Sequence, residues 1–317
     1  MKTLVTGGAG FIGSHVVDEL VRRGHEVIVY DNFTAGFRVH LDGALQSGLV
    51  TIVEGDILDD RCLIEAMQGV STIYHLAANA DVRGGIRNTS IDLEQNVLGT
   101  HRVLEAMRTT GAMEIIFTSS ATVYGEPDLF PTPEEYAALQ TSTYGASKLA
   151  GEAFIQAYCE YFGMRCHIFR FVSWLGERYC HGVVYDFAKK LLANPRELGI
   201  LGDGNQKKSY LDVEDGVQGM FLAVDRMNAR KNIVNLGHEN WVDVKELADV
   251  VCQEMGLEGV VYRFAGGTRG WLGDSPFVHL DISRIKREGF VPKIDIREGI
   301  RRTVRYLLSN PWLLEKR

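Results

Sequence analysis

The stretch that decides the fold lies at the N-terminus, where residues 2–13 read Lys-Thr-Leu-Val-Thr-Gly-Gly-Ala-Gly-Phe-Ile-Gly. A short apolar strand runs into a G-x-G-x-x-G pattern that ends at Gly13, and the following residues, up to Arg23, have helical periodicity. Glycines at these positions permit a tight turn, close approach of the backbone to a pyrophosphate and close packing of helix on strand. The helix N-terminus then offers N–H groups to phosphates. The stretch therefore predicts a dinucleotide-binding turn.

An acidic residue marks the end of the next strand candidate. Asp31 follows residues 26–30 and lies 18 positions after Gly13, where a carboxylate can accept hydrogen bonds from the ribose hydroxyls of adenosine. It would repel a 2′-phosphate, and residues 32–34 bring no Arg or Lys. We therefore predict NAD rather than NADP. Asp56 could reach the adenine amino group, or it could be a surface acid that closes a strand.

Short apolar runs alternate with helical patterns through the first half of the chain. Each run is rich in β-branched or aromatic residues, and the strand candidates are residues 2–6, 26–30, 50–54, 72–76, 115–118 and 166–171. Continuous apolar strands separated by helices indicate a parallel sheet that is covered on both faces. We predict an α/β fold with a doubly wound, Rossmann-like parallel sheet.

The second half of the chain is less regular. Helices are expected at residues 183–192, 244–255 and 297–308, and a strand at residues 232–236 could return to the sheet. The predicted domains are a dinucleotide-binding domain over residues 1–170, with a return around 206–240, and a smaller mixed α/β substrate domain over residues 171–205 and 241–317.

Composition excludes several functional classes. The net charge is −7, which disfavours a general nucleic-acid or anionic-membrane binder, because such a protein is expected to carry a basic stripe. The five cysteines include no C-x-x-C pair, so neither a zinc site nor a disulfide framework is expected. Neither a signal peptide nor an apolar run of membrane-spanning length is visible. We expect no metal and a reducing, cytoplasmic setting.

A second motif follows the strand candidate that ends at residue 118. Ser120 lies just after that strand, and carboxyl ends of strands in such sheets are where ligands bind. Tyr144 and Lys148 are spaced i and i+4, so on a helix they share a face. An ammonium close to a phenol is expected to lower the pKa of the tyrosine and make it a usable base. The alternative is a chance pair on a surface helix.

Together these motifs resemble the extended short-chain dehydrogenase/reductase family, in its nucleotide-sugar epimerase branch, and the resemblance covers nearly the whole chain. Within that branch the chain resembles UDP-glucose 4-epimerases of the shorter archaeal and bacterial kind. The motifs that carry the resemblance are residues 6–13, Asp31-Asn32, Asp56-Ile57, residues 75–78, Asn96, Ser120, Tyr144, Lys148, and residues 181–187 and 202–210. The cofactor-binding residues that it implies are Gly7, Gly10, Phe11, Ile12, Gly13, Asp31, Asn32, Asp56, Ile57, Leu76, Ala77, Ala78, Asn96, Tyr144 and Lys148.

The resemblance also implies a chemistry. Tyr144 would take the proton from a sugar 4-hydroxyl while hydride passes from C4 to NAD, and Ser120 would hydrogen-bond the same oxygen. Lys148 would bind the nicotinamide ribose and keep Tyr144 acidic. The 4-keto sugar would then turn and take hydride back on its other face. Related dehydratases carry an Asp-Glu pair, and decarboxylases a Glu, close to where this chain has Ala121 and Thr122. Without a carboxylic acid there, elimination lacks its general acid, which favours simple 4-epimerisation.

The same resemblance places a nucleotide-sugar site in the second half of the chain. It implies Ser173, Lys208 and Arg269 as ligands of the diphosphate and Asp274 as the acid that binds the uridine ribose. Ser173 stands where the family has Asn, and Leu201 where an aromatic residue often stacks on uracil. Each of these side chains could instead be an ordinary surface group. A homodimer is also implied, formed through the helix that starts near Asp92 and the helix that carries Tyr144.

The sugar is less closely specified. The reaction expected is interconversion of UDP-glucose and UDP-galactose. Val278 lies at a gate that is bulky in strict epimerases of this pair, so an N-acetylhexosamine is an alternative. Arg178 could pair with a uronic acid, or could form an internal salt bridge. A rival of another class is a non-catalytic nucleotide-binding protein on the same scaffold.

Overall fold

The computed structural model describes residues 1–315, and the chain divides into two compact units. The first unit comprises Met1–Tyr124, Ala138–Arg170 and Met220–Val234. The second comprises Gly125–Ala137, Phe171–Gly219 and the chain from Asn235 onward. The stretch 125–137 therefore groups with the second unit, and the segment that returns to the first is short. The domain limits given above stay a prediction.

A seven-stranded sheet forms the centre of the first unit, in the order β11-β6-β5-β4-β1-β2-β3. Its strands are β1 (Lys2–Thr6), β2 (Glu26–Asp31), β3 (Val50–Glu54), β4 (Thr72–His75), β5 (Glu114–Thr118), β6 (Arg165–Phe171) and β11 (Lys231–Leu236). Neighbouring strands from β3 to β6 pair in parallel. The predicted doubly wound parallel sheet is confirmed. Its order reverses between β1 and β4, which is where such sheets bind ligands.

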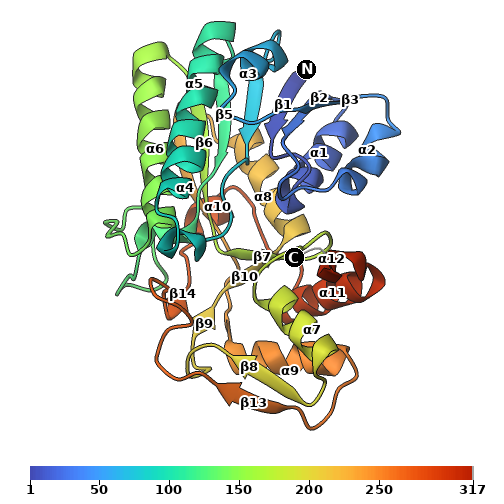
Figure 1. Ribbon diagram of the computed structural model, residues 1–317. Coiled ribbons are helices and arrows are strands. Elements are labelled where there is room, and N and C mark those ends of the chain that lie inside the picture. The colour runs from blue at the N-terminus through green and yellow to red at the C-terminus, as the bar shows by residue number, and fades with distance from the viewer. Residues whose placement is uncertain (316–317) are drawn as a thin grey trace. The chain divides into compact units, whose positions relative to one another are not determined.

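Helices cover both faces of this sheet. The α5 and α6 helices stand side by side on one face and contact each other, while α1 and α2 lie on the other (Figure 1). The helical elements of this unit are α1 (Phe11–Arg22), η1 (Arg38–Leu41), α2 (Asp42–Leu45), α3 (Asp60–Ala66), η2 (Gly84–Ile86), α4 (Ser90–Asp92), η3 (Leu93–Leu98), α5 (Gly99–Thr110), η4 (Ala121–Tyr124) and α6 (Thr143–Phe162). Helix α8 (Val213–Arg226) begins in the second unit and ends in the first.

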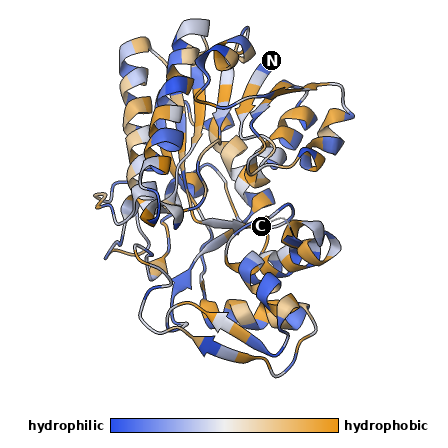
Figure 2. Ribbon diagram, in the orientation of Figure 1, coloured by the Kyte–Doolittle hydropathy of each residue, from blue (hydrophilic) through white to orange (hydrophobic). Residues whose placement is uncertain are grey.

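Hydrophobic burial explains this layering. Hydrophobic and hydrophilic residues alternate along α5 and α6 (Figure 2), because only one side of each helix packs on the core. That core joins residues of the strands and of α3, α5 and α6, including Leu4, Ile73, Leu104, Phe117 and Ile155, which are almost completely buried.

The second unit is built from short sheets with helices. Its strands are β7 (Ser173–Leu175), β8 (Glu197–Ile200), β9 (Lys207–Lys208), β10 (Tyr210–Asp212), β12 (Val242–Asp243), β13 (Val261–Phe264) and β14 (Phe277–Val278). They form the sheets β10-β7, β12-β9-β14 and β13-β8. Its helices are α7 (Val183–Ala193), α9 (Val244–Glu254), α10 (Ser283–Arg287), α11 (Ile296–Ser309) and α12 (Trp312–Glu315). Within residues 1–315, the helices are all too short or too polar to cross a membrane.

Two local features position the predicted active residues. Ser142 caps α6, because its hydroxyl accepts a hydrogen bond from the Gly145 amide at 3.1 Å. Tyr144 therefore lies in the first turn of that helix, close to the carboxyl edge of the sheet. The π-helix η3 carries Asn96 inward, and such wide turns are frequent at functional sites.

Candidate active site

The glycine turn after β1 accepts only glycine at two of its positions. A Cβ on Gly13 would lie 2.8 Å from the Gly8 Cα and closer still to the Gly7 carbonyl oxygen. A Cβ on Gly7, which has φ of 69°, would lie 2.7 Å from the Ala77 amide nitrogen. No side chain caps the N-terminus of α1. These are the properties that a bound pyrophosphate requires, so the turn fits the dinucleotide that the sequence predicts.

The acid at the end of β2 is held rigidly. The two carboxylate oxygens of Asp31 accept hydrogen bonds from the amides of Ala9 at 2.9 Å and Phe33 at 2.8 Å. Burial raises the pKa of Asp31, while those two hydrogen bonds lower it. Next to it, Asn32 Nδ2 donates to Asp56 Oδ2 at 2.9 Å. The structure therefore brings the three predicted adenosine-side residues together.

Two further predicted cofactor residues, Leu76 and Ala77, lie beside Gly7 of the glycine turn. The amides of Leu76 and Ala77 donate to the carbonyl and hydroxyl oxygens of Thr6 at 3.1 and 3.2 Å. Phe11 and Ile57 are buried, and Ile12 and Ala78 are half-buried.

Tyr144 and Lys148 lie together as their spacing predicts. Lys148 is 3% exposed. Its ammonium lies 5.9 Å from the centre of the Tyr144 ring and donates to the Thr118 carbonyl at 2.9 Å. The hydroxyl of Ser120 accepts from the Thr122 amide at 3.2 Å and also hydrogen-bonds Tyr144. All three predicted catalytic residues thus meet at the carboxyl edge of β5.

The expected lowering of the pKa of Tyr144 is wrong. Burial raises the pKa of Tyr144 to about 12, the charge of Asp92 adds to the rise, and the Ser120 hydrogen bond only partly opposes it. Burial also lowers the pKa of Lys148 to about 8. Both shifts disfavour the charged form, and the i, i+4 spacing alone could not reveal how deeply the pair is buried.

A buried polar network beside this pair was not predicted. Asn96, expected to contact the cofactor, uses its side-chain amide inside the protein: Nδ2 donates to Ser147 Oγ at 2.8 Å, and Oδ1 accepts from the Asn79 amide at 2.8 Å. Asp92 lies four residues before Asn96 and is 1% exposed. The sequence did hold one indication of this network, because Asp92 lies one helical turn before the predicted site residue Asn96.

A second unpredicted network lies behind Ser120. Arg170 donates from Nε and Nη2 to the two carboxylate oxygens of Glu152, at 3.0 and 2.7 Å, and from Nη1 to the Tyr124 hydroxyl at 3.0 Å. Ser119 Oγ donates to Glu152 Oε1 at 2.5 Å. Glu152 follows Lys148 by one helical turn, which was the signal in the sequence. The network fixes the end of β5 against α6.

Three of the predicted nucleotide-sugar residues meet in the second unit. Lys208 Nζ donates to Asp274 Oδ1 at 2.5 Å, and the other oxygen of Asp274 accepts from the Gly270 amide at 3.1 Å. Arg269 forms an ion pair with Glu126, which was not predicted. Ser173 is exposed on β7. Both cations in this cluster thus have carboxylate partners.

Leu201, considered for stacking on uracil, and Val278, considered as a gate for the sugar, are neighbours of this cluster. Leu201 is 45% exposed and lies beside Gly270. Val278 of β14 pairs directly with Lys208 of β9. The position considered as a gate therefore adjoins the position considered as a phosphate ligand.

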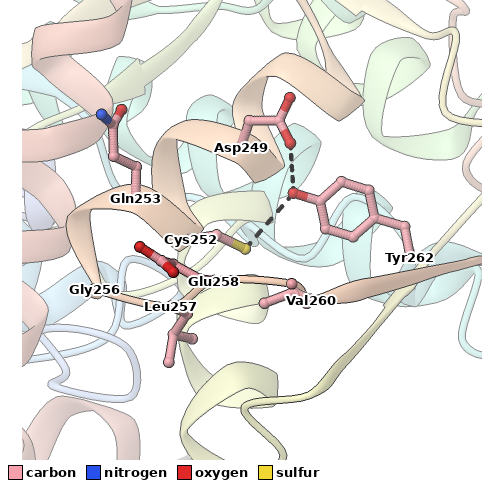
Figure 3. Close-up of a pocket in the computed structure, with 9 residues that line it drawn as sticks. Asp249, Cys252, Gln253, Gly256, Leu257, Glu258, Val260 and Tyr262 are labelled. Atoms are coloured by element: carbon pink, nitrogen blue, oxygen red, sulfur yellow. Dashed lines mark hydrogen bonds between the residues drawn. The ribbon is translucent and has the colours of Figure 1, made fainter.

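A pocket of about 400 Å³ in the second unit contains none of the predicted residues (Figure 3). It lies between the end of α9 and β13. Tyr262 donates there to Asp249 Oδ1 at 2.6 Å and to Cys252 Sγ at 3.7 Å. Burial raises the pKa of Cys252, so the thiol is a weak nucleophile. We assign no chemistry to this pocket.

The chain is similar to known proteins over almost its whole length. The model of the NAD dependent epimerase/dehydratase family matches residues 3–237. A UDP-glucose 4-epimerase from Mycolicibacterium smegmatis is 32% identical over 96% of this chain and 98% of its own. UDP-glucuronate 4-epimerase 4 from Arabidopsis thaliana is 31% identical over 98% of this chain and 76% of its own. A crystal structure of UDP-galactose 4-epimerase, 35% identical, superposes with a TM-score of 0.89 over 98% of this chain and all of that one.

The fold and the glycine turn define a dinucleotide-dependent enzyme with a Rossmann-like sheet. The chain belongs to the NAD-dependent epimerase/dehydratase family. It is accordingly an isomerase that uses NAD as its cofactor, and its relatives support a nucleotide sugar as the class of substrate.

Proposed function

We propose that this enzyme interconverts UDP-glucose and UDP-galactose by inverting the configuration at C4. The observation that carries the proposal is the arrangement of Ser120, Tyr144 and Lys148 at one strand end, with Ala121 and Thr122 in place of an acid. A site with a hydroxyl base, and with no carboxylic acid at the two positions that follow Ser120, can oxidise and reduce a carbinol carbon. It lacks the general acid that dehydration needs.

Each residue of this group has a distinct role in the proposal. Bound NAD supplies a hydride acceptor that returns the hydride within the same cycle. Tyr144 removes the proton from the 4-hydroxyl oxygen as the hydride leaves C4, and gives it back in the second half of the cycle. Ser120 hydrogen-bonds that oxygen and holds it in place. Lys148 hydrogen-bonds the nicotinamide ribose, and its ammonium stabilises the phenolate of Tyr144.

The second unit is proposed to hold the nucleotide. Lys208 and Arg269 carry the charge that a diphosphate needs, and their present partners are carboxylates. We propose that Arg269 exchanges Glu126 for a phosphate oxygen, and that Asp274 keeps Lys208 in place and contacts the ribose. The hydroxyl of Ser173 donates a hydrogen bond to the diphosphate. The bidentate geometry of arginine suits such an exchange.

Substrate panels test this function. UDP-glucose, UDP-galactose, UDP-N-acetylglucosamine, UDP-N-acetylgalactosamine, UDP-glucuronate and UDP-galacturonate are each incubated with the purified protein, and the sugars are released and separated. We expect fastest turnover of the glucose and galactose pair, and reduction of the bound cofactor visible by absorbance. Faster turnover of an N-acetylhexosamine or a uronate would replace the proposed substrate. Loss of water or carbon dioxide from any sugar would contradict the reaction type.

We also propose that the enzyme is a homodimer that pairs η3, α5 and α6 with their copies. Large apolar side chains remain exposed there, with Leu98 at 45%, Phe154 at 42% and Tyr161 at 78%. Exposed apolar groups on adjacent helices favour association. Sedimentation of the wild type and of Phe154→Asp tests this, and a wild-type monomer would refute it. A cytoplasmic location remains a prediction that fractionation of the source cells would check.

A further inference from the structure

Asp92 is a buried carboxylate held only by uncharged donors. Its Oδ1 accepts from Asn79 Nδ2 at 2.8 Å and from Asn96 Nδ2 at 3.3 Å, and its Oδ2 accepts from Thr143 Oγ1 at 2.7 Å. Within the described part of the chain, no lysine, arginine or histidine forms an ion pair with it. A charge that is buried to this extent is costly unless a nearby opposite charge compensates it.

The surrounding charges single out Lys148 as that opposite charge. Glu152 also acts on Lys148, but its own charge is cancelled by the two hydrogen bonds from Arg170. Burial lowers the pKa of His75 to about 3, so that ring is neutral. The charged groups of the adjacent loop are exposed, and they are Asp81, Arg83 and Arg87. Asp92 and Lys148 are therefore the two buried charged groups among these residues whose charges no other group compensates.

We propose that Asp92 is the counter-charge of Lys148 and a positioning residue of the Tyr144–Lys148 pair: it keeps the lysine protonated at neutral pH and keeps the proton on the tyrosine until substrate and cofactor are bound. This inference rests on the proposed function of that pair.

The electrostatic effects on the two groups agree with this role. Asp92 is the largest of the influences that raise the pKa of Lys148 against burial. The same charge raises the pKa of Tyr144. One carboxylate therefore moves the pKa of both groups in the same direction, as a negative charge that acts on both must do.

The network also ties Asp92 to the position of Tyr144. Thr143, which donates to Asp92, precedes Tyr144 in the chain. A Cβ on Gly85 would lie 2.8 Å from Asp92 Oδ2 and would overlap the Thr143 hydroxyl. The loop that contains Gly85 therefore packs directly against the Asp92 carboxylate and the Thr143 hydroxyl, and a carboxylate buried in this way interacts with nearby charges more strongly than one in water.

The test compares Asp92→Asn with Thr143→Val in the holoenzyme. The first variant removes the charge in a side chain of the same size. The second removes one hydrogen bond and keeps the charge. We measure kcat of sugar epimerisation against pH, together with the thermal midpoint of each protein. For Asp92→Asn we expect both limbs of the pH profile to move to lower pH by about 1 unit. For Thr143→Val we expect a lower rate with both limbs in place.

Two outcomes would overturn the proposal. One is a pH profile of kcat for Asp92→Asn that coincides with that of the wild type, and the other is a profile for Thr143→Val that shifts as far as that of Asp92→Asn. If Asp92→Asn does not fold, Asp92→Ser takes its place. The same shift is also read without turnover, from tyrosinate absorbance of each protein minus that of its Tyr144→Phe counterpart. A Tyr144→Phe enzyme that keeps full activity would refute the proposed function of the pair, and is thereby distinguished from a failure of Asp92 alone.

Discussion

Replacement of Gly13 by alanine tests how the glycine turn works. The added Cβ would lie 2.8 Å from the Gly8 Cα and 2.9 Å from the Gly7 carbonyl carbon, and real Cβ atoms do not approach backbone that closely. The neighbours are main-chain atoms, so they cannot relieve the overlap by a rotamer change. Overpacking of this kind costs about 3 kcal/mol, and the turn must open to accommodate it. We expect Gly13→Ala to unfold at lower urea concentration and to purify with little bound NAD.

Gly43→Ala is the matched control, because it adds the same methyl group to a helix of the same unit. An added Cβ at Gly43 meets nothing within 4 Å, so the change should be neutral or stabilising by about 0.5–1 kcal/mol. Bound NAD is measured by absorbance after denaturation, and stability by urea unfolding. A Gly13→Ala protein that keeps wild-type NAD content and stability would refute the steric account of the turn.

Four further predictions concern Tyr144, Arg170, His75 and Val278. Tyr144→Phe removes the proposed base and should lower kcat by about 10²–10⁴-fold with little change in the unfolding midpoint; a smaller loss would point to another base. Arg170→Met leaves Glu152 buried and unpaired and should cost about 3–5 kcal/mol in urea unfolding, and an unchanged midpoint would contradict that. The pKa of His75 is about 3 in the folded chain against 6.5 when unfolded. The free energy of unfolding should therefore fall by about 5 kcal/mol in all as the pH drops from 6.5 toward 3, because the unfolded chain then binds a proton that the folded chain does not. In His75→Asn, urea unfolding should show a smaller loss of stability over this pH range. Val278→Tyr should slow turnover of UDP-N-acetylhexosamines more than turnover of UDP-galactose. If the ratio of the two rates on the substrate panel does not change, Val278 does not act as a gate.

The sheet was largely predictable from sequence because its strands are short, buried on both faces and separated by amphipathic helices. Strands β1 and β3 have the predicted limits, and β11 joins the sheet beside β6 as its apolar pattern suggested. Tyr144 and Lys148 were predictable as a pair because helical spacing alone puts them on one face.

The electrostatics of the site could not be predicted in the same way. Whether a nearby lysine lowers the pKa of Tyr144 depends on burial and on Asp92, which lies 52 positions earlier in the chain. Likewise, the ion pair of Arg269 joins residues 143 positions apart. Motifs report which residues are close in sequence, whereas such charge partners are brought together only by the fold.

Lys148 also has a consequence for the folding of the chain. Its pKa falls from 10.5 to about 8 on burial, so at neutral pH the folded chain holds an ammonium that water would solvate better. The buried ammonium destabilises the folded state by about 3 kcal/mol at neutral pH. This cost disappears as the pH rises from 8 to 10.5, because Lys148 loses its proton in the folded chain while it stays protonated in the unfolded chain. Replacing Lys148 alone would leave Asp92 buried without its counter-charge. The double variant Lys148→Met, Asp92→Asn avoids this, and without cofactor it should be no less stable than the wild type at pH 7. The residue proposed to make the chemistry work is thus one that folding alone would not select, an instance of activity maintained against stability.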